Sequence, residues 1–159
     1  MDVRKLDQRQ YDQKLRMVIV GTEGLHAHVQ DVGDTMATIG WGYTLNRDNN
    51  AEIWARAGLE LTPEQRATLE RVDRAPWDEK TRIGLRFDRV LTVAESDMLF
   101  RASVAEYEGP AMHAGLPLSE ERVAMVSVTY NRGVGALRTH PIIDALQERK
   151  RAEAWFQLR

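Results

Sequence analysis

The sequence predicts an α+β chain that is mainly helical and carries one small antiparallel sheet near its N-terminus. Apolar residues recur at helical spacing over residues 7–22 and again over residues 120–132. Between these two segments, residues 26–45 contain short β-prone pieces separated by glycines and aspartates. One helix, a small sheet and then several helices is an order typical of an α+β chain with two lobes.

The first helix is expected over residues 7–22. Its apolar residues fall at positions i, i+4, i+7 and i+8, which places them on one face: Tyr11, Leu15, Val18 and Ile19. Gly24 follows the helix and is a common kind of helix terminator. The sheet is expected from the three pieces that come next, residues 26–30, 37–41 and 43–45.

Several helices are predicted in the rest of the chain. A short helix begins at Asn50 and ends before Gly58. Two capping boxes, residues 62–65 and 92–95, each mark a helix start, because an acidic or amide residue stands three places after a threonine. Residues 120–132 are apolar on nearly all sides, which indicates a buried central helix, and a last helix is expected from Pro141 to about Trp155.

Composition excludes several classes of function. The net charge is −2 and no basic stripe stands out, which argues against a nucleic-acid partner. No apolar run approaches the ~20 residues of a membrane span, and the polar N-terminus lacks a signal-peptide core. Cysteine is absent, and the close pair His26 and His28 has no third ligand at a recognisable spacing, so we expect no metal.

Carboxyl groups around the first turn of the sheet suggest acid catalysis. Glu23 falls at the negative end of the first helix and follows an apolar run, and both features favour its neutral, proton-donating form. Asp31 and Asp34 lie in a polar turn, where a carboxylate stays ionised. Two carboxyl groups in such different environments are typical of a glycosidase. The plainer alternative is an exposed helix end beside aspartates that only shape a turn.

These residues resemble glycoside hydrolase family 24, the phage-type lysozymes, which include those of T-even phages. The match rests on residues 23–25 (Glu-Gly-Leu) and on residues 38–42 (Thr-Ile-Gly-Trp-Gly), with Thr38 at the family's interval of 15 residues after the glutamate. Residues 91–95 and 126–133 resemble the family's capped helix start and its buried helix. The resemblance covers about two thirds of the chain.

The resemblance implies a lysozyme-like fold with two lobes around a cleft, and hydrolysis of the β-1,4 bond between N-acetylmuramic acid and N-acetylglucosamine. Glu23 would be the proton donor, Asp31 would stabilise charge or orient water, and Thr38 would hold that water. No cofactor is needed. Asn131 and Trp41 are candidate sugar contacts, although Trp41, like other aromatic residues of a small sheet, is more often packed into the core.

Three departures from the family pattern accompany the match. The family's aspartate position holds Val32, so Asp31 comes one residue early and Asp34 two residues late. Residues 47–90 are longer and more charged than the family's linker region. The chain stops at Arg159, where the family continues with further helices. We expect one catalytic domain over residues 1–159, with a β-lobe at about 24–48, taken from a longer protein.

Two other functions share these features. A lytic transglycosylase also uses a lone glutamate, but the Thr38 match argues against it. A lysozyme-like domain that binds glycan or protein without cutting would fit the displaced aspartate. The site of action would be the periplasm and cell wall, where a monomer is delivered by a holin or, as a toxin effector, by a secretion system. An immunity or inhibitor protein, or the delivery machinery, would then be a partner.

Overall fold

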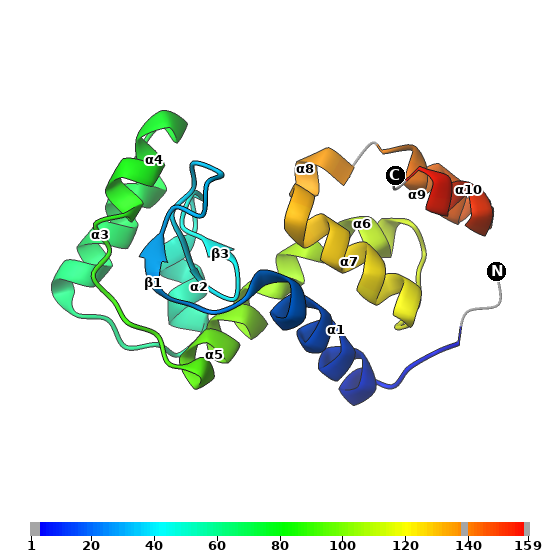
Figure 1. Cartoon of the computed structure of the whole chain (residues 1–159), viewed down its shortest axis with the longest axis horizontal. Coiled ribbons are helices and arrows are strands. Elements are labelled where there is room, and N and C mark those ends of the chain that lie inside the picture. The colour runs from blue at the N-terminus through cyan, green and yellow to red at the C-terminus, as the bar shows by residue number, and fades with distance from the viewer. Residues whose placement is uncertain (1–3, 138–139, 158–159) are drawn as a thin grey trace. The chain divides into compact units, whose positions relative to one another are not determined.

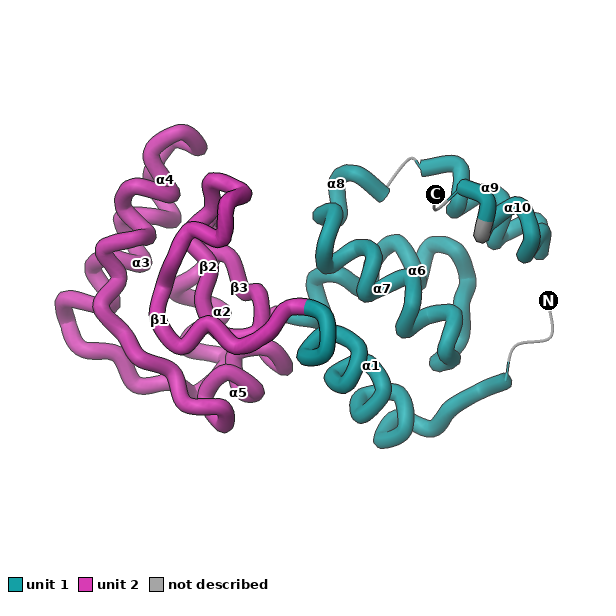
Figure 2. Tube along the Cα trace, in the orientation of Figure 1, with its two compact units in different colours: residues 1–22, 104–159 teal, residues 23–103 magenta. Residues whose placement is uncertain are grey.

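The computed structural model describes residues 4–137 and 140–157, and the chain divides into two compact units. Residues 23–103 form one unit, here called the sheet unit, which is magenta in Figure 2. Residues 1–22 and 104–159 form the other, here called the helical unit. The sheet unit extends well beyond the expected lobe at 24–48, because four helices that follow the strands belong to it.

Within the described residues, the sheet has three antiparallel strands in the order β1-β2-β3. They are β1 (His26–Gln30), β2 (Thr38–Gly40) and β3 (Tyr43–Thr44). Strand β1 pairs with β2 through Gln30 opposite Thr38, and β2 pairs with β3 through Thr38 opposite Thr44. The three predicted strands, and the α+β class of the chain, are therefore confirmed.

Four helices complete the sheet unit: α2 (Asn50–Arg56), α3 (Pro63–Arg74), α4 (Trp77–Gly84) and α5 (Val93–Val104), whose last residue passes into the helical unit. Both predicted capping boxes are present. Thr62 accepts the backbone N–H of Gln65, and Thr92 accepts that of Glu95, while each partner side chain reaches back to the threonine N–H. Helix α4 was not predicted. It lies beside α3 in Figure 1.

The core of the sheet unit joins the sheet to these helices. Trp54 of α2 is fully buried and meets Tyr43 and Phe87 edge to face, at ring-centroid distances of 6.3 and 5.0 Å. Other buried members come from β2 and the residues that flank the strands, from α2, α3 and α5, and from the segment before α5, namely Ala37, Ile39, Leu45, Ile53, Leu69, Val72, Leu91 and Leu99. The strands are thus held on a packed base, which fixes the loops at their ends.

The helical unit contains α1 (Gln8–Glu23), η1 (Ala105–Tyr107), α6 (Gly109–His113), α7 (Glu120–Arg132), α8 (Val134–Leu137), α9 (Pro141–Gln147) and α10 (Arg151–Phe156) (Figure 1). Helix α1 buries the face that its apolar spacing predicts: Tyr11, Leu15 and Ile19. Helix α7 occupies the predicted residues. None of the helices in the part of the chain that the structure describes combines the length and apolarity of a membrane span.

The C-terminal segment differs from its prediction. Instead of one helix from Pro141 to about Trp155, two helices are separated at Arg149, whose φ of +60° lies in the left-handed region. The N–H of Arg149 donates to the carbonyl of Leu146 and that of Lys150 to the carbonyl of Ala145. These two bonds form a Schellman motif, which ends a helix. The break lacks the glycine that usually marks it.

A polar cluster ties α1 to the rest of the helical unit. The Tyr11 hydroxyl donates to Oε1 of Glu108 over 2.6 Å, and Nε of Arg122 donates to the other carboxylate oxygen over 2.7 Å. Burial raises the pKa of the Tyr11 phenol above its ordinary value, and the Glu108 carboxylate raises it further. The phenol therefore keeps its proton well into the alkaline range, and the cluster holds α1 through its N-terminal half.

Candidate active site

Glu23 is the last residue of α1 and the first residue of the sheet unit. The helix ends there because Gly24 adopts a φ of +70°, a left-handed conformation that is costly for other residues. The Glu23 side chain is half-buried, as its place after an apolar run predicts. Its carboxyl group therefore stands at the negative end of the helix dipole and is partly removed from water.

Gly42, in the turn between β2 and β3, makes room for this carboxyl group. A Cβ atom added to Gly42 would lie 2.7 Å from Oε2 of Glu23 and 3.0 Å from its Cδ and Cγ. No side chain can occupy that space while Glu23 keeps its position. Gly42 also has a φ of +77°, so the turn itself favours glycine. The second glycine of the Thr-Ile-Gly-Trp-Gly strand thus brings the turn backbone against the carboxylate.

Trp41 joins the same turn to α5. Its indole N–H donates to Oδ1 of Asp97 in α5 over 2.9 Å, and the residue is only 8% exposed. Tyr43 is 1% exposed, and its hydroxyl donates to Asn50. Both rings are therefore buried, and a sugar contact by Trp41 stays a prediction.

Asp31 and Asp34 both accept backbone hydrogen bonds within the exposed turn that follows β1. Asp31 lies directly after the strand, as predicted, and its Oδ1 accepts the N–H groups of Gly33 and Thr35 over 2.8 and 3.0 Å. Oδ1 of Asp34 accepts the N–H of Met36 over 3.0 Å. Both aspartates therefore bond to the backbone of the turn, and these bonds are more numerous at Asp31.

Thr38 begins β2 and is 6% exposed. It pairs with Gln30, the residue just before Asp31, so Asp31 and Thr38 leave the β1–β2 pair at the same end. The turn that carries Asp31 and Asp34 is attached at this end.

Asn131 belongs to the helical unit. It lies in the last turn of α7, it is exposed, and its Nδ2 donates to the carbonyl of Ser127 over 3.1 Å. Nδ1 of His26 lies 2.6 Å from the side-chain amide nitrogen of Gln30. Over residues 4–137 and 140–157, no group of three or more His, Cys, Asp or Glu side chains is arranged to hold a metal.

The part of the chain that carries this site matches a known family. The family model for phage lysozyme matches residues 20–159, which include the glutamate, the hairpin and α7. The chain belongs to the phage lysozyme family. Neither a comparison with curated proteins nor one with solved structures finds a match. Membership in the phage lysozyme family implies a peptidoglycan hydrolase of the glycosidase class, whose substrate is the bacterial cell wall.

Two contacts of this phage lysozyme site were not found from the sequence. Gly42 belongs to the matched residues 38–42, but the sequence did not indicate that it makes space for Glu23. Asp97 was not singled out at all, because its bond to Trp41 joins residues 56 positions apart. Only the first contact had a signal in the sequence, the glycine itself.

Proposed function

We propose that this phage lysozyme family member is a muramidase, which hydrolyses the β-1,4 bond between N-acetylmuramic acid and N-acetylglucosamine. The proposal rests on the environment of Glu23. Its side chain is half-buried at a helix end and lies against the backbone of Gly42. Partial burial and the negative helix end both favour the protonated form that a general acid must have. Glutamine at this position would keep the shape and lose the proton.

In the proposed reaction, Glu23 gives its proton to the glycosidic oxygen as the bond from that oxygen to the anomeric carbon breaks. Positive charge then develops on the sugar ring, and the Asp31 carboxylate stabilises it or accepts a proton from the attacking water. Thr38 holds that water, and the water oxygen forms the new bond to the anomeric carbon. Asn131 is the proposed sugar contact from α7. The reaction needs no cofactor.

Asp31 remains the preferred partner of Glu23. It lies one residue from the Gln30–Thr38 pair, whereas Asp34 lies deeper in the turn. Its Oδ1 accepts the N–H groups of Gly33 and Thr35. A carboxylate held by two backbone donors has a fixed orientation, which suits a group that must face developing charge.

The products of sacculus digestion test the proposal and separate it from its alternatives. Purified sacculi are incubated with the chain, the soluble fragments are reduced with borohydride, and their sugar ends are identified. Reduced muramic acid at the ends would support a muramidase. Reduced glucosamine would show cleavage of the other glycosidic bond, anhydro ends would show a lytic transglycosylase, and an absence of soluble fragments would show a domain that binds without cutting.

The setting of this activity is proposed with it. The chain would act as a monomer and a single catalytic domain on glycan strands in the periplasm and cell wall, reached through a holin or a secretion system. An immunity or inhibitor protein would be its partner in the second case. The net charge of −2 supports delivery close to the substrate, because it provides no long-range attraction to an anionic wall.

A further inference from the structure

Helix α4 contacts the turn that carries both aspartates. The Thr81 hydroxyl donates to the carbonyl of Thr35 over 2.6 Å and accepts Nδ2 of Asn46 over 2.7 Å. Oδ1 of Asn46 in turn accepts the N–H of Ala37 over 3.0 Å. Two side chains therefore hold residues 35–37 at both ends, immediately before β2 begins at Thr38.

The held segment is strained. Thr35 has a φ of +63°, a conformation that is unfavourable for any residue with a β-branched side chain. It persists because the N–H of Thr35 donates to Asp31 while its carbonyl accepts from Thr81. Loss of the Thr81 bond would allow Thr35 to relax, and the Asp31 carboxylate would lose one of its two backbone donors as a result.

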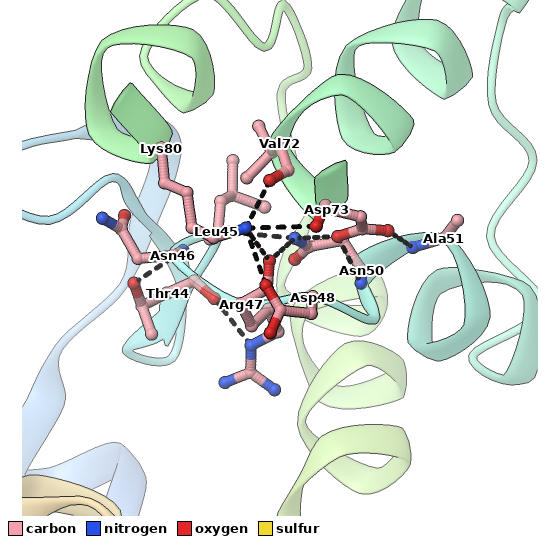
Figure 3. Close-up of polar contacts among 10 residues, drawn as sticks. All are labelled: Thr44, Leu45, Asn46, Arg47, Asp48, Asn50, Ala51, Val72, Asp73 and Lys80. Carbon is pink, nitrogen blue, oxygen red and sulfur yellow. Dashed lines mark hydrogen bonds and ion pairs between the residues drawn. The ribbon is translucent and has the colours of Figure 1, made fainter. Parts of the chain in front are cut away.

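Helix α4 is also held through Lys80, whose polar contacts are drawn in Figure 3. Lys80, the residue before Thr81, is 3% exposed, and its ammonium group donates to the carbonyls of Val72, Asp73 and Arg47 and pairs with Asp48 at 2.8 Å. These contacts fasten α4 to the end of α3 and to the segment that follows β3. The position of Thr81 is therefore fixed in part by contacts outside the turn that it holds.

Gly84 of α4 also lies close to this turn. A Cβ atom at Gly84 of α4 would lie 2.8 Å from Cβ of Ala37, so the helix backbone rests directly on the residue before Thr38. Helix α4 (Trp77–Gly84) therefore packs against the end of the turn that carries both aspartates.

We infer that Thr81, together with Asn46, is a positioning residue for the reaction: it holds residues 35–37 so that Asp31 and Thr38 face the substrate correctly. The inference rests on the proposed function, because Asp31 and Thr38 have their roles there. Neither Thr81 nor Asn46 touches the reacting atoms in this account. They act through the turn, and their loss should affect turnover more than binding.

The test compares Thr81→Val, which keeps the side-chain volume and removes both hydrogen bonds, with Thr81→Ser, which keeps the hydroxyl. We expect kcat on purified sacculi to fall at least about tenfold in the valine variant with a smaller change in KM, because displacements of about 1 Å can cost roughly 10²-fold. The serine variant should have a kcat within about threefold of the wild-type value. A difference of that size corresponds to less free energy than one hydrogen bond contributes. Amide hydrogen exchange at residues 35–37 should accelerate in the valine variant alone.

Thr68→Val is the matched control. Thr68 is a buried threonine of the neighbouring helix α3, and its hydroxyl bonds only within that helix, to the carbonyl of Glu64 and to Arg71. Its substitution should leave kcat and the exchange of residues 35–37 unchanged. If Thr81→Val does not fold, Asn46→Asp serves instead: it can still accept from Ala37 but cannot donate to Thr81, and it should show the same two effects.

Wild-type kcat in Thr81→Val, or unchanged exchange at residues 35–37, would overturn the inference. Failure of the proposed function would look different. A wild-type chain that released no soluble fragments would contradict the muramidase proposal and any catalytic role for the turn, while the exchange rates would still report whether Thr81 holds it.

Discussion

Substitution of Gly42 by alanine displaces the Glu23 side chain while Glu23 itself is left unsubstituted. The new Cβ would lie 2.7 Å from Oε2 of Glu23, whereas non-bonded atoms of this kind prefer about 3.5 Å, so the carboxyl group has to move by roughly 0.8 Å. Misplacement of a catalytic group by about 1 Å can cost ~10²-fold in rate. We therefore expect Gly42→Ala to lose at least about tenfold in the rate of sacculus digestion.

The same substitution also has a backbone cost. An alanine at a φ of +77° destabilises the folded chain by about 1 kcal/mol, which corresponds to a decrease of roughly 2–4 °C in melting temperature at this chain length. Gly58→Ala separates the two effects. Gly58 has a φ of +70°, and a Cβ there would meet only the mobile end of Met98 at 3.8 Å.

The assay measures reducing ends released from purified sacculi, together with the melting temperature of each variant. Both alanine variants should melt a few degrees below the wild type, but only Gly42→Ala should lose activity. If Gly42→Ala digests sacculi at more than half the wild-type rate, the close approach of Glu23 to this turn has no catalytic importance. If Gly58→Ala is equally inactive, general destabilisation is the cause.

Three further predictions follow from contacts described above. Asp31→Asn should keep the turn, because an amide oxygen accepts the same two N–H bonds, and lose most activity, whereas Asp34→Asn should lose little; the reverse result would assign the role to Asp34. Because the pKa of Tyr11 is raised in the folded chain, the unfolded chain deprotonates first, near the ordinary value of about 10. The free energy of unfolding should therefore decrease as pH rises above about 10, and Tyr11→Phe should make this decrease shallower in urea titrations; an equally steep decrease would refute the contribution. Arg149→Gly should stabilise the chain by about 0.5–1 kcal/mol, since φ of +60° suits glycine, and urea unfolding that shows no gain would contradict this.

Local patterns predicted most of the fold. Helix α1 was predicted because its apolar spacing is regular, and α3 and α5 because their capping boxes are local sequence signals. Helix α4 escaped prediction because its N-cap is Pro76, which forms no side-chain cap. The predicted last helix was too long, because the left-handed conformation that ends α9 is adopted by Arg149 and not by a glycine.

The sequence predicted those parts of the candidate site whose residues are close together along the chain. Glu23 at the helix end and Asp31 at the end of β1 follow from element boundaries alone. The approach of Glu23 to Gly42 joins residues on either side of β1 and β2, and no local pattern contains that information. Trp41 shows the same limit, because its burial depends on α5 and Asp97.

Glu23→Gln is the most direct test of the central claim that this carboxyl group is the general acid. The variant keeps the volume of the side chain and removes the proton, so its melting temperature should stay the same or rise. Glu64→Gln, at an exposed glutamate in the first turn of α3, is the matched control. The account predicts that Glu23→Gln releases reducing ends from sacculi at least ~10²-fold more slowly than the wild type, while Glu64→Gln is unaffected. A folded Glu23→Gln variant that retains more than about a tenth of the wild-type rate would contradict the account.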